Sequence, residues 1–350
     1  MLSKGMPFWR LVATAVLGPP VLAGALICAL AAWLGQLGRK SAAWDVLTHV
    51  APFYLAAGVL TLGAALIFHD RYRTLALVLG GLIIAAAALL MAPEYLRSAG
   101  PRAAADAPGQ LKVVQFNAWG GQGGIDKAAA WLAAQHPDFL IVEESTRALR
   151  EAIQARSGMV LTGGRANVAI FSRAPPLLVE RPDDDLTGPM MLNEATFQTA
   201  AGPTSVLGVH YPWPTERDRL KLTPNLVEVV RSHPADTTLL VGDFNSTPWS
   251  FTRRREDREF GLIRRTRALY SWPALPKVPV PLLPIDHVYA GAAWATVSVS
   301  RGPRLGSDHY PVVVILAPVA PSPAAPATAS APPRSSPPGS RAASPAPPRP

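Results

Sequence analysis

Three long apolar stretches occupy the first hundred residues of the chain and constrain its fold more than any other feature. They run from about residue 11 to 34, 50 to 68 and 74 to 92, and they hold almost no charge. A helix needs about 20 apolar residues to cross a hydrocarbon core of about 30 Å, so we predict three transmembrane helices within residues 1–100. The competing interpretation is a signal peptide followed by two buried helices. It is disfavoured because the first stretch is too long for a signal peptide and lacks a clear cleavage site.

The charges that flank these stretches do not decide how the helices are oriented. Lysine and arginine are equally numerous on the two sides, whereas the cytoplasmic side normally has more of them. Three spans place the two ends of the chain on opposite sides of the membrane. With a short cytoplasmic amino terminus, we expect an integral protein of the inner or plasma membrane whose part after residue 100 is extracytoplasmic.

Residues 101–317 have the composition of one sizeable α/β domain, whereas residues 318–350 do not. The latter are almost entirely Pro, Ala, Ser and Arg, which cannot bury apolar surface, so we expect a disordered tail. The chain has a formal net charge of +9, yet basic and acidic residues nearly balance within residues 101–317. This balance argues against a protein that grips long nucleic acid by its phosphates. The single cysteine, Cys28, lies in the first apolar stretch, so the domain can form no disulfide.

Polar residues stand at the ends of the strands that we predict in this domain. The apolar runs predict strands at residues 112–117, 139–144, 168–172, 191–198, 205–211, 237–245, 284–289, 295–300 and 311–316, and helices at 125–135, 147–156 and 216–232. Alternating strands and helices of this kind assemble their sites at the ends of the strands. The polar residues at these positions are Asn117, Glu144, His210, Asp243, Asn245, Asp286, Asp308 and His309.

The residue types in this set predict a site for a divalent cation and a phosphate ester. Carboxylate and amide oxygens suit Mg²⁺ or Mn²⁺ better than zinc, and histidine can transfer protons near neutral pH. The domain has no thiol, no Gly-x-Ser-x-Gly elbow and no His-Glu-x-x-His helix. The set therefore indicates metal-assisted attack of water on a phosphate ester.

Short motifs along residues 111–317 resemble, in order, those of the endonuclease/exonuclease/phosphatase superfamily, which includes deoxyribonuclease I. The motifs are Gln115-Phe-Asn117, residues 137–144, residues 168–173, Val209-His210, Gly242-Asp-Phe-Asn245, Ile285-Asp-His287 and Ser307-Asp-His309. Gly-Asp-Phe-Asn and Ser-Asp-His together are the most specific of them. The resemblance implies a two-sheet α/β sandwich like that of deoxyribonuclease I, here preceded by three transmembrane helices, with its site at one edge.

The resemblance also implies which residues face the metal. Glu144 looks like the metal ligand, Asn117 would help to order the metal and the scissile phosphate, and Asp308 matches a second carboxylate on the metal side. Glu143 precedes this ligand, and in a regular strand it would point to the other face. Trp119 stands where several nucleases have an Asp, which weakens the resemblance to apurinic endonucleases.

The remaining five residues are similar to catalytic residues of the family. Asp243 resembles the residue that orients or deprotonates the attacking water, and Asn245 would hold a phosphate oxygen. His309 resembles the histidine that stabilises the transition state or moves a proton, with Asp286 as its orienting carboxylate. His210 aligns with the second histidine of the nuclease and sphingomyelinase branches.

The leading hypothesis is a membrane-anchored hydrolase of the phosphodiesterase and nuclease class that uses Mg²⁺ or Mn²⁺. Its substrate would be a phospholipid head group or another small phosphodiester, and no obligate protein partner is evident. The first alternative is a membrane-tethered nuclease for short or single-stranded nucleic acid, with the arginines of residues 253–267 as a binding rim; a solvated surface explains that cluster equally well. The second is a non-catalytic binding protein on the same fold. We expect loops at 174–190 and 250–283 to set the choice of substrate.

Overall fold

The fold is that of a computed structural model of the 350-residue chain. The structure describes residues 7–163, 168–180, 191–215, 219–278 and 280–319. The tail that we predict from residue 318 onward therefore lies, beyond residue 319, outside the described residues. So does the greater part of the loop at 174–190.

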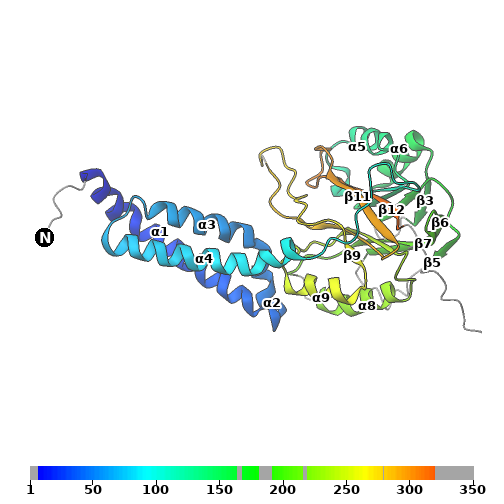
Figure 1. The fold of residues 1–350 in the computed structure, drawn as a ribbon. Helices are drawn as coiled ribbons and strands as arrows, with labels where there is room; N and C mark the ends of the chain where they lie inside the picture. The colour runs from blue at the N-terminus through cyan, green and yellow to red at the C-terminus, as the bar shows by residue number, and fades with distance from the viewer. Residues whose placement is uncertain (1–6, 164–167, 181–190, 216–218, 279, 320–350) are drawn as a thin grey trace, which may run out of the picture. The chain divides into compact units, whose positions relative to one another are not determined.

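The three apolar stretches form three long helices (Figure 1): α1 (Phe8–Gly35), α3 (Ala51–Ala64) and α4 (Asp70–Leu96). Three short elements join α1 to α3: η1 (Gln36–Arg39), α2 (Ala42–Asp45) and η2 (Val46–Val50). By length and composition, Phe8–Arg39, Ala42–Ala64 and Asp70–Leu96 can each cross a membrane. Three apolar helices of spanning length were predicted, and the described residues contain three candidate spans.

Two glycines allow α3 and α4 to lie in close contact. A Cβ atom on Gly58 would lie 2.7 Å from a side-chain carbon of Ile84, and one on Gly80 would lie 2.7 Å from a side-chain carbon of Leu62. Small residues at such positions are typical of helices that pack within a membrane, because association there depends on close van der Waals contact.

Residues 111–318 form two six-stranded sheets, which is the predicted two-sheet α/β sandwich (Figure 1). The first sheet has the order β11-β12-β1-β2-β4-β3 and the second β5-β6-β7-β8-β10-β9. The strands are β1 (Leu111–Asn117), β2 (Phe139–Glu143), β3 (Val160–Gly163), β4 (Ala169–Ser172), β5 (Leu178–Glu180), β6 (Met191–Thr199), β7 (Gly202–His210), β8 (Leu239–Asp243), β9 (Ile263–Arg264), β10 (Asp286–Ala290), β11 (Trp294–Arg301) and β12 (Val312–Pro318). Within each sheet one pair of named strands is parallel, β1 with β2 and β7 with β8.

Side chains alternate between the core of the sandwich and its outer faces. In β1, Val113 packs between the sheets, whereas Val114 packs under the outer helices. In β8, Val241 belongs to the core between the sheets. Because successive side chains of a strand point to opposite faces, Asn117 and Asp243 continue the inner rows of these two strands. The last inward positions of the strands are therefore polar, and they lie at one end of the core.

Helices cover the outer faces of both sheets (Figure 1). α5 (Ile125–Ala134) and α6 (Arg147–Ser157) pack on the first sheet, and α8 (Arg219–Arg231) packs on the second. α9 (Phe251–Glu259) follows β8 and contacts α8.

The apolar helices and the sandwich share a buried apolar cluster. Ala51 of α3 and Leu90 and Met91 of α4 pack against Trp249 and Phe251, which lie between β8 and α9 and at the start of α9. The described residues from 7 to 319 accordingly belong to one compact unit. The sequence predicted an anchor and a domain, but it gave no sign of a core common to both.

Candidate active site

The centre of the candidate site is His309, which lies between two buried carboxylates. His309 precedes β12, and its Nδ1 lies 2.9 Å from Oδ2 of Asp286, the first residue of β10. Its Nε2 lies 3.6 Å from Oδ2 of Asp243, the last residue of β8. His309 is 3% exposed and both carboxylates are fully buried. Burial lowers the pKa of the imidazole, but Asp286 and Asp243 outweigh burial and raise it to about 10.

Asn117 connects the two sheets at this point. Its Nδ2 donates to Oε1 of Glu144 at 3.1 Å and to Oδ2 of Asp243 at 3.0 Å. Its Oδ1 accepts from the backbone N–H of Trp119 at 2.9 Å, which fixes the orientation of the amide. In this arrangement Asn117 presents its amide nitrogen to the carboxylates and so links Glu144 to Asp243.

Glu144 comes directly after β2 and has a left-handed backbone conformation, with φ of 48°. The strand therefore ends at Glu143, and the next side chain does not follow the regular alternation. Its carboxylate also lies 3.7 Å from Nε2 of His210, and its side chain is 34% exposed, so it is accessible to a ligand.

Asn245 and His210 form the other side of the site. Asn245 Nδ2 donates to the carbonyl oxygen of Tyr211 at 2.8 Å and to Nε2 of His210 at 3.3 Å. Its backbone N–H donates to Oδ1 of Asp243 at 2.7 Å. Among the described residues, Nδ1 of His210 and Oδ1 of Asn245 are buried and have no hydrogen-bond partner. Buried polar atoms are normally paired, so these two indicate a place that a bound group completes.

The motif Gly242-Asp-Phe-Asn245 begins with glycine because the neighbouring strand leaves no room for a side chain at position 242. A Cβ atom at this position would lie 1.8 Å from the carbonyl oxygen of Val209 in the neighbouring strand β7. The close approach allows His210 and Asp243 to stand side by side as register partners at the ends of β7 and β8.

The geometry fits a divalent cation. Asp243, Asp286 and His309 have ligand-type atoms within 4.8 Å of one another, and of these the carboxylate oxygens suit a cation, because both ring nitrogens of His309 already face carboxylates. Among the described residues, the only basic side chains within 4.0 Å of the carboxylates of Glu144, Asp243 and Asp286 are His210 and His309. Burial raises the pKa of Asp243, and the neighbouring Asp286 raises it further against the opposing effect of His309. Buried oxygen ligands with too little positive charge nearby suit Mg²⁺ or Mn²⁺.

The side chain of Asp308 contacts other residues than those of the cluster around His309. Its Oδ2 accepts from Nε1 of Trp272 at 3.1 Å, and its Oδ1 lies 3.5 Å from Oγ of Ser307. Trp272 in turn meets Trp213 edge to face, with ring centroids 5.9 Å apart, and Trp213 is 44% exposed. Hydrogen bonds and close contacts link the other seven predicted residues into one cluster, whereas Asp308 lies beside an aromatic pair.

Two residues that the sequence analysis did not assign to the site lie directly beneath it. Gln115 Nε2 donates to Oε2 of Glu143 at 2.9 Å and to Oδ1 of Asp286 at 2.8 Å. Burial raises the pKa of Glu143 well above its ordinary value, and the carboxylates of Asp286 and Asp243 add to this effect. The expectation that Glu143 points to the other face was wrong, because it continues the inner row of β2 while Glu144 lies beyond the end of the strand. The alternation of Phe139, Ile141 and Glu143 was the signal that could have revealed it, because Phe139 and Ile141 both point into the core between the sheets.

Three arginines of the cluster at residues 253–267 are buried, so they form neither a solvated surface nor a phosphate-binding rim. Arg253, Arg264 and Arg265 are each at most 2% exposed. Arg253 pairs with Glu256 and lies over the ring of Phe244, with its guanidinium carbon 4.3 Å from the centroid. The alternation of charges in the sequence concealed these buried structural roles.

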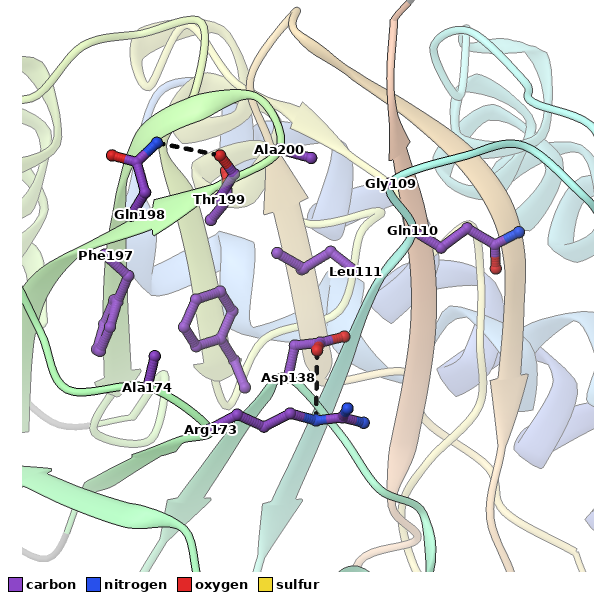
Figure 2. A pocket seen from close by; sticks show the side chains of 11 residues that line it. Gly109, Gln110, Leu111, Asp138, Arg173, Ala174, Phe197, Gln198, Thr199 and Ala200 are labelled. Atoms are coloured by element: carbon purple, nitrogen blue, oxygen red, sulfur yellow. Dashed lines mark hydrogen bonds and ion pairs between the residues drawn. The ribbon is translucent and has the colours of Figure 1, made fainter.

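A separate cavity lies at the opposite end of β1, away from the candidate site. It has a volume of about 200 Å³ and is lined by Leu111, Phe139 and Phe197 with polar residues at its margin (Figure 2). The charged residues there, Asp138 and Arg173, lie 3.4 Å apart and face each other. None of the eight predicted site residues lines it, so the predicted chemistry belongs to the cluster around His309.

Comparison with known proteins shows the family and the fold. Residues 114–309 match the sequence model of the Endonuclease/Exonuclease/phosphatase family. The solved structure of the endonuclease/exonuclease/phosphatase from Bacteroides vulgatus is similar with a TM-score of 0.50 and 16% identity, over 60% of this chain and 99% of that one. Lower similarity is found to sphingomyelinase C from Streptomyces griseocarneus, with a TM-score of 0.43, 16% identity and coverage of 59% and 99%. It is also found to D. rerio TDP2 complexed with single strand DNA product, with a TM-score of 0.47, 15% identity and coverage of 59% and 98%. No curated protein gives a significant match.

Proposed function

The chain belongs to the endonuclease/exonuclease/phosphatase family, and on this premise we propose that it is a membrane-anchored, divalent-metal-dependent phosphoesterase. Its proposed substrate is a phosphodiester, either a phospholipid head group or another small diester. One observation carries the proposal, namely the buried His309 held at 2.9 Å by Asp286 and facing Asp243 at 3.6 Å. A protein that only binds phosphate does not require a proton donor and a proton acceptor at this separation.

The proposed reaction adds water to phosphorus and breaks the bond to the leaving alcohol. Asp243 accepts a proton from the attacking water, which its raised pKa favours. His309 gives its Nε2 proton to the leaving oxygen, and its Nδ1 stays hydrogen-bonded to Asp286. Since Asp243 and His309 face each other, the proton taken from water can return to the imidazole after the products leave.

The other residues bind and orient the phosphate. Asn245 and His210 lie beside Asp243, where their buried unpaired atoms meet an incoming group. Glu144 would hold the cation, and Asn117 fixes the positions of the Glu144 and Asp243 carboxylates relative to each other. A divalent cation there would offset the negative charge of the phosphate as the reaction proceeds.

Two observations support a lipid substrate. Residues 101–317 carry nearly balanced charge, and the segment that follows Asn245 packs on Ala51, Leu90 and Met91 of the apolar helices. If those helices cross a bilayer, the site lies near its head groups. The nuclease alternative is weakened because Arg253, Arg264 and Arg265 are buried.

The test uses the full-length protein in detergent micelles and in lipid vesicles. We expect Mg²⁺-dependent hydrolysis of bis(p-nitrophenyl) phosphate and of a phosphodiester lipid such as sphingomyelin, and loss of activity with EDTA. Asp243→Asn and His309→Gln should each lower kcat about 100-fold or more, because each removes a proton-transfer group. Asp70→Asn is the matched control, since this carboxylate is exposed at the start of α4.

Three results would contradict parts of the proposal. Absence of turnover on every substrate, or full activity of Asp243→Asn, rules out the catalytic function. Faster cleavage of single-stranded DNA than of lipid favours the nuclease alternative. Activity that persists without divalent cations rules out the metal.

We further propose that the sandwich lies outside the cytoplasm in an inner or plasma membrane. Three helices of spanning length support this location if the amino terminus is cytoplasmic. A reporter enzyme that is active only outside the cytoplasm, fused after residue 319, should be active. An inactive reporter, together with an active cytoplasmic one at the same position, would place the site inside the cell.

A further inference from the structure

The segment that carries Asn245 continues into a region held by the connection between the first two apolar helices. After Asn245 the chain runs through Thr247 and Trp249 into α9. Asn245 itself has a left-handed backbone, with φ of 47°. A residue in this conformation keeps its place only where its surroundings fix it, so the partners of the following residues matter for the site.

Asp45 of α2 caps α9 although it lies about two hundred residues earlier in the chain. Its Oδ1 accepts from the backbone N–H of Phe251 at 2.8 Å, and its Oδ2 accepts from that of Thr252 at 2.8 Å and from Oγ of Ser250 at 3.0 Å. Asp45 is 3% exposed. The first N–H groups of a helix have no partner within the helix, and a carboxylate there satisfies them and opposes the positive end of the helix dipole.

His49 of η2 fixes the residues between Asn245 and that helix. Its Nδ1 accepts from the backbone N–H of Thr247 at 3.1 Å, so the ring carries its proton on Nε2. The carbonyl oxygen of His49 accepts from Nε1 of Trp249 at 3.2 Å, and this indole is fully buried. The contact with Thr247 is two residues away from Asn245.

The close fit of the two segments depends on Gly38. A Cβ atom there would lie 2.8 Å from the ring of Phe251 and 2.9 Å from Cα of Asp45. On the other side, Arg254 of α9 donates to the carbonyl oxygens of Leu90 in α4 and of Trp249. The residues from 247 to 254 are thus held on one side by residues 38–49 and on the other by α4.

We propose that Asp45 and His49 are positioning residues of the active site, which act by fixing the segment that bears Asn245. This inference rests on the proposed function. It makes the connection between the first two apolar helices a working part of the enzyme, in addition to any role in membrane attachment. Neither residue touches the reacting atoms, and both act through the backbone of residues 247–252.

The test compares Asp45→Ala and His49→Leu with Asp70→Ala and His69→Leu in the full-length protein. The control residues lie at the start of α4, where His69 Nδ1 is 2.8 Å from Asp70 Oδ2, so the control variants remove the same chemical groups from a different part of the apolar region. On bis(p-nitrophenyl) phosphate, the first two variants should lower kcat about tenfold or more with little change in KM, because small misplacements of a catalytic group are costly. The control variants should match the wild type.

Two further measurements separate positioning from a general loss of stability. Hydrogen–deuterium exchange at the amides of Thr247, Phe251 and Thr252 should become faster in the first two variants and stay slow in the controls. His49→Asn and Asp45→Asn each keep an acceptor oxygen and should restore part of kcat. A stability defect alone would lower the melting temperature without lowering kcat at a temperature well below melting.

The outcomes distinguish this inference from the proposed function. If the wild type is active and Asp45→Ala or His49→Leu keeps full kcat, the positioning role is wrong and the phosphoesterase function stands. If Asp45→Ala does not fold, His49→Leu and His49→Asn decide the question. If the wild type hydrolyses no phosphodiester, the proposed function fails, and unchanged exchange in His49→Leu would show that the segment is not held from the anchor either.

Discussion

A single buried amide, that of Gln115, connects two acidic residues under the site. Its Nε2 donates to both Asp286 and Glu143. The orientation of Asp286 decides which of its oxygens faces His309, and partners of this kind usually affect activity strongly although they touch no substrate. Gln115 therefore supports the histidine through one intermediate residue.

We predict that Gln115→Met lowers kcat about 10-fold to 100-fold, the usual range for partners of catalytic ligands. Methionine keeps the volume but donates no hydrogen bond, so Asp286 loses one of its two fixed partners. Steady-state kinetics on a chromogenic diester, together with a pH–rate profile, measures the effect. Gln110→Met, at the exposed residue before β1, is the control. An unchanged kcat and an unchanged pH profile would show that Asp286 needs no support.

The residues that form the cluster around His309 could be proposed from residue types and their order in the chain. Gln115 and Glu143, which lie beneath that cluster, could not. Polar residues at the ends of apolar runs identified Asn117, Asp243 and Asp286, because strand alternation carries inward side chains to the edge of the core. From the sequence, Glu144 was predicted as the metal ligand and Glu143 was expected on the other face, and the second expectation failed because it depends on where β2 stops. The left-handed backbone at Glu144 is a tertiary effect that a pattern of apolar residues does not contain.

At the scale of secondary structure, His233 ties the end of α8 to the edge of the second sheet. Its Nε2 lies 2.8 Å from Oε2 of Glu194 in β6, and its Nδ1 lies 3.8 Å from Oε2 of Glu180 in β5. The hydrogen bond to Glu194 raises the pKa of His233, and burial opposes this only in part. The protonated imidazole therefore binds these carboxylates more strongly in the folded state.

We predict that this contact makes the fold less stable as pH rises. The folded pKa exceeds the unfolded value of about 6.5, so the stabilisation is complete below about pH 6.5 and is lost as pH rises through the folded pKa. His233→Gln should lower the free energy of unfolding relative to the wild type. The difference should be largest at about pH 6 and smallest at about pH 9. Urea denaturation at several pH values measures this, and Glu194→Gln should flatten the same dependence. Parallel curves for wild type and both variants would exclude the contribution.

Long elements were easier to predict than short ones for a physical reason. The helices α1, α3 and α4 and the strand β8 have continuous apolar runs, so local composition decides them. The strands β3, β5 and β9 and the helix α9 lack such runs, and tertiary partners stabilise them. In α9, Arg253 is buried because aromatic rings and Glu256 surround it, and charge alternation alone suggested a solvated surface.

At the scale of the whole molecule, the apolar helices supply buried contacts to the sandwich. Glu94 near the end of α4 pairs with Arg264 of β9 at 2.7 Å, and both are 2% exposed. Arg264 also pairs with Asp257 at 2.8 Å. Removing residues 1–100 would expose Trp249 and Phe251 and take one carboxylate from a buried guanidinium.

We predict that the sandwich alone, residues 101–319, is less stable than the full chain by about 3 kcal/mol or more, the usual cost of breaking a buried ion pair. Denaturation of both proteins in the same detergent, followed by the fluorescence of tryptophan, measures the difference. Ending the full chain after residue 319 is the control and should leave the transition in place. Equal transitions for the two proteins would mean that the shared cluster contributes nothing.

The pair of Glu94 and Arg264 also bears on the order in which the protein is made. The two residues are 170 positions apart in the chain, so α4 leaves the ribosome long before its partner arginine is synthesised. During that interval Glu94 has only Arg97, three residues later, as its partner at 2.7 Å, and even a pair of charged side chains is costly to bury in hydrocarbon. We therefore expect the end of α4 to lie at the surface of the bilayer until β9 has been synthesised. Arg264 of β9 then pairs with Glu94 and holds it at that position.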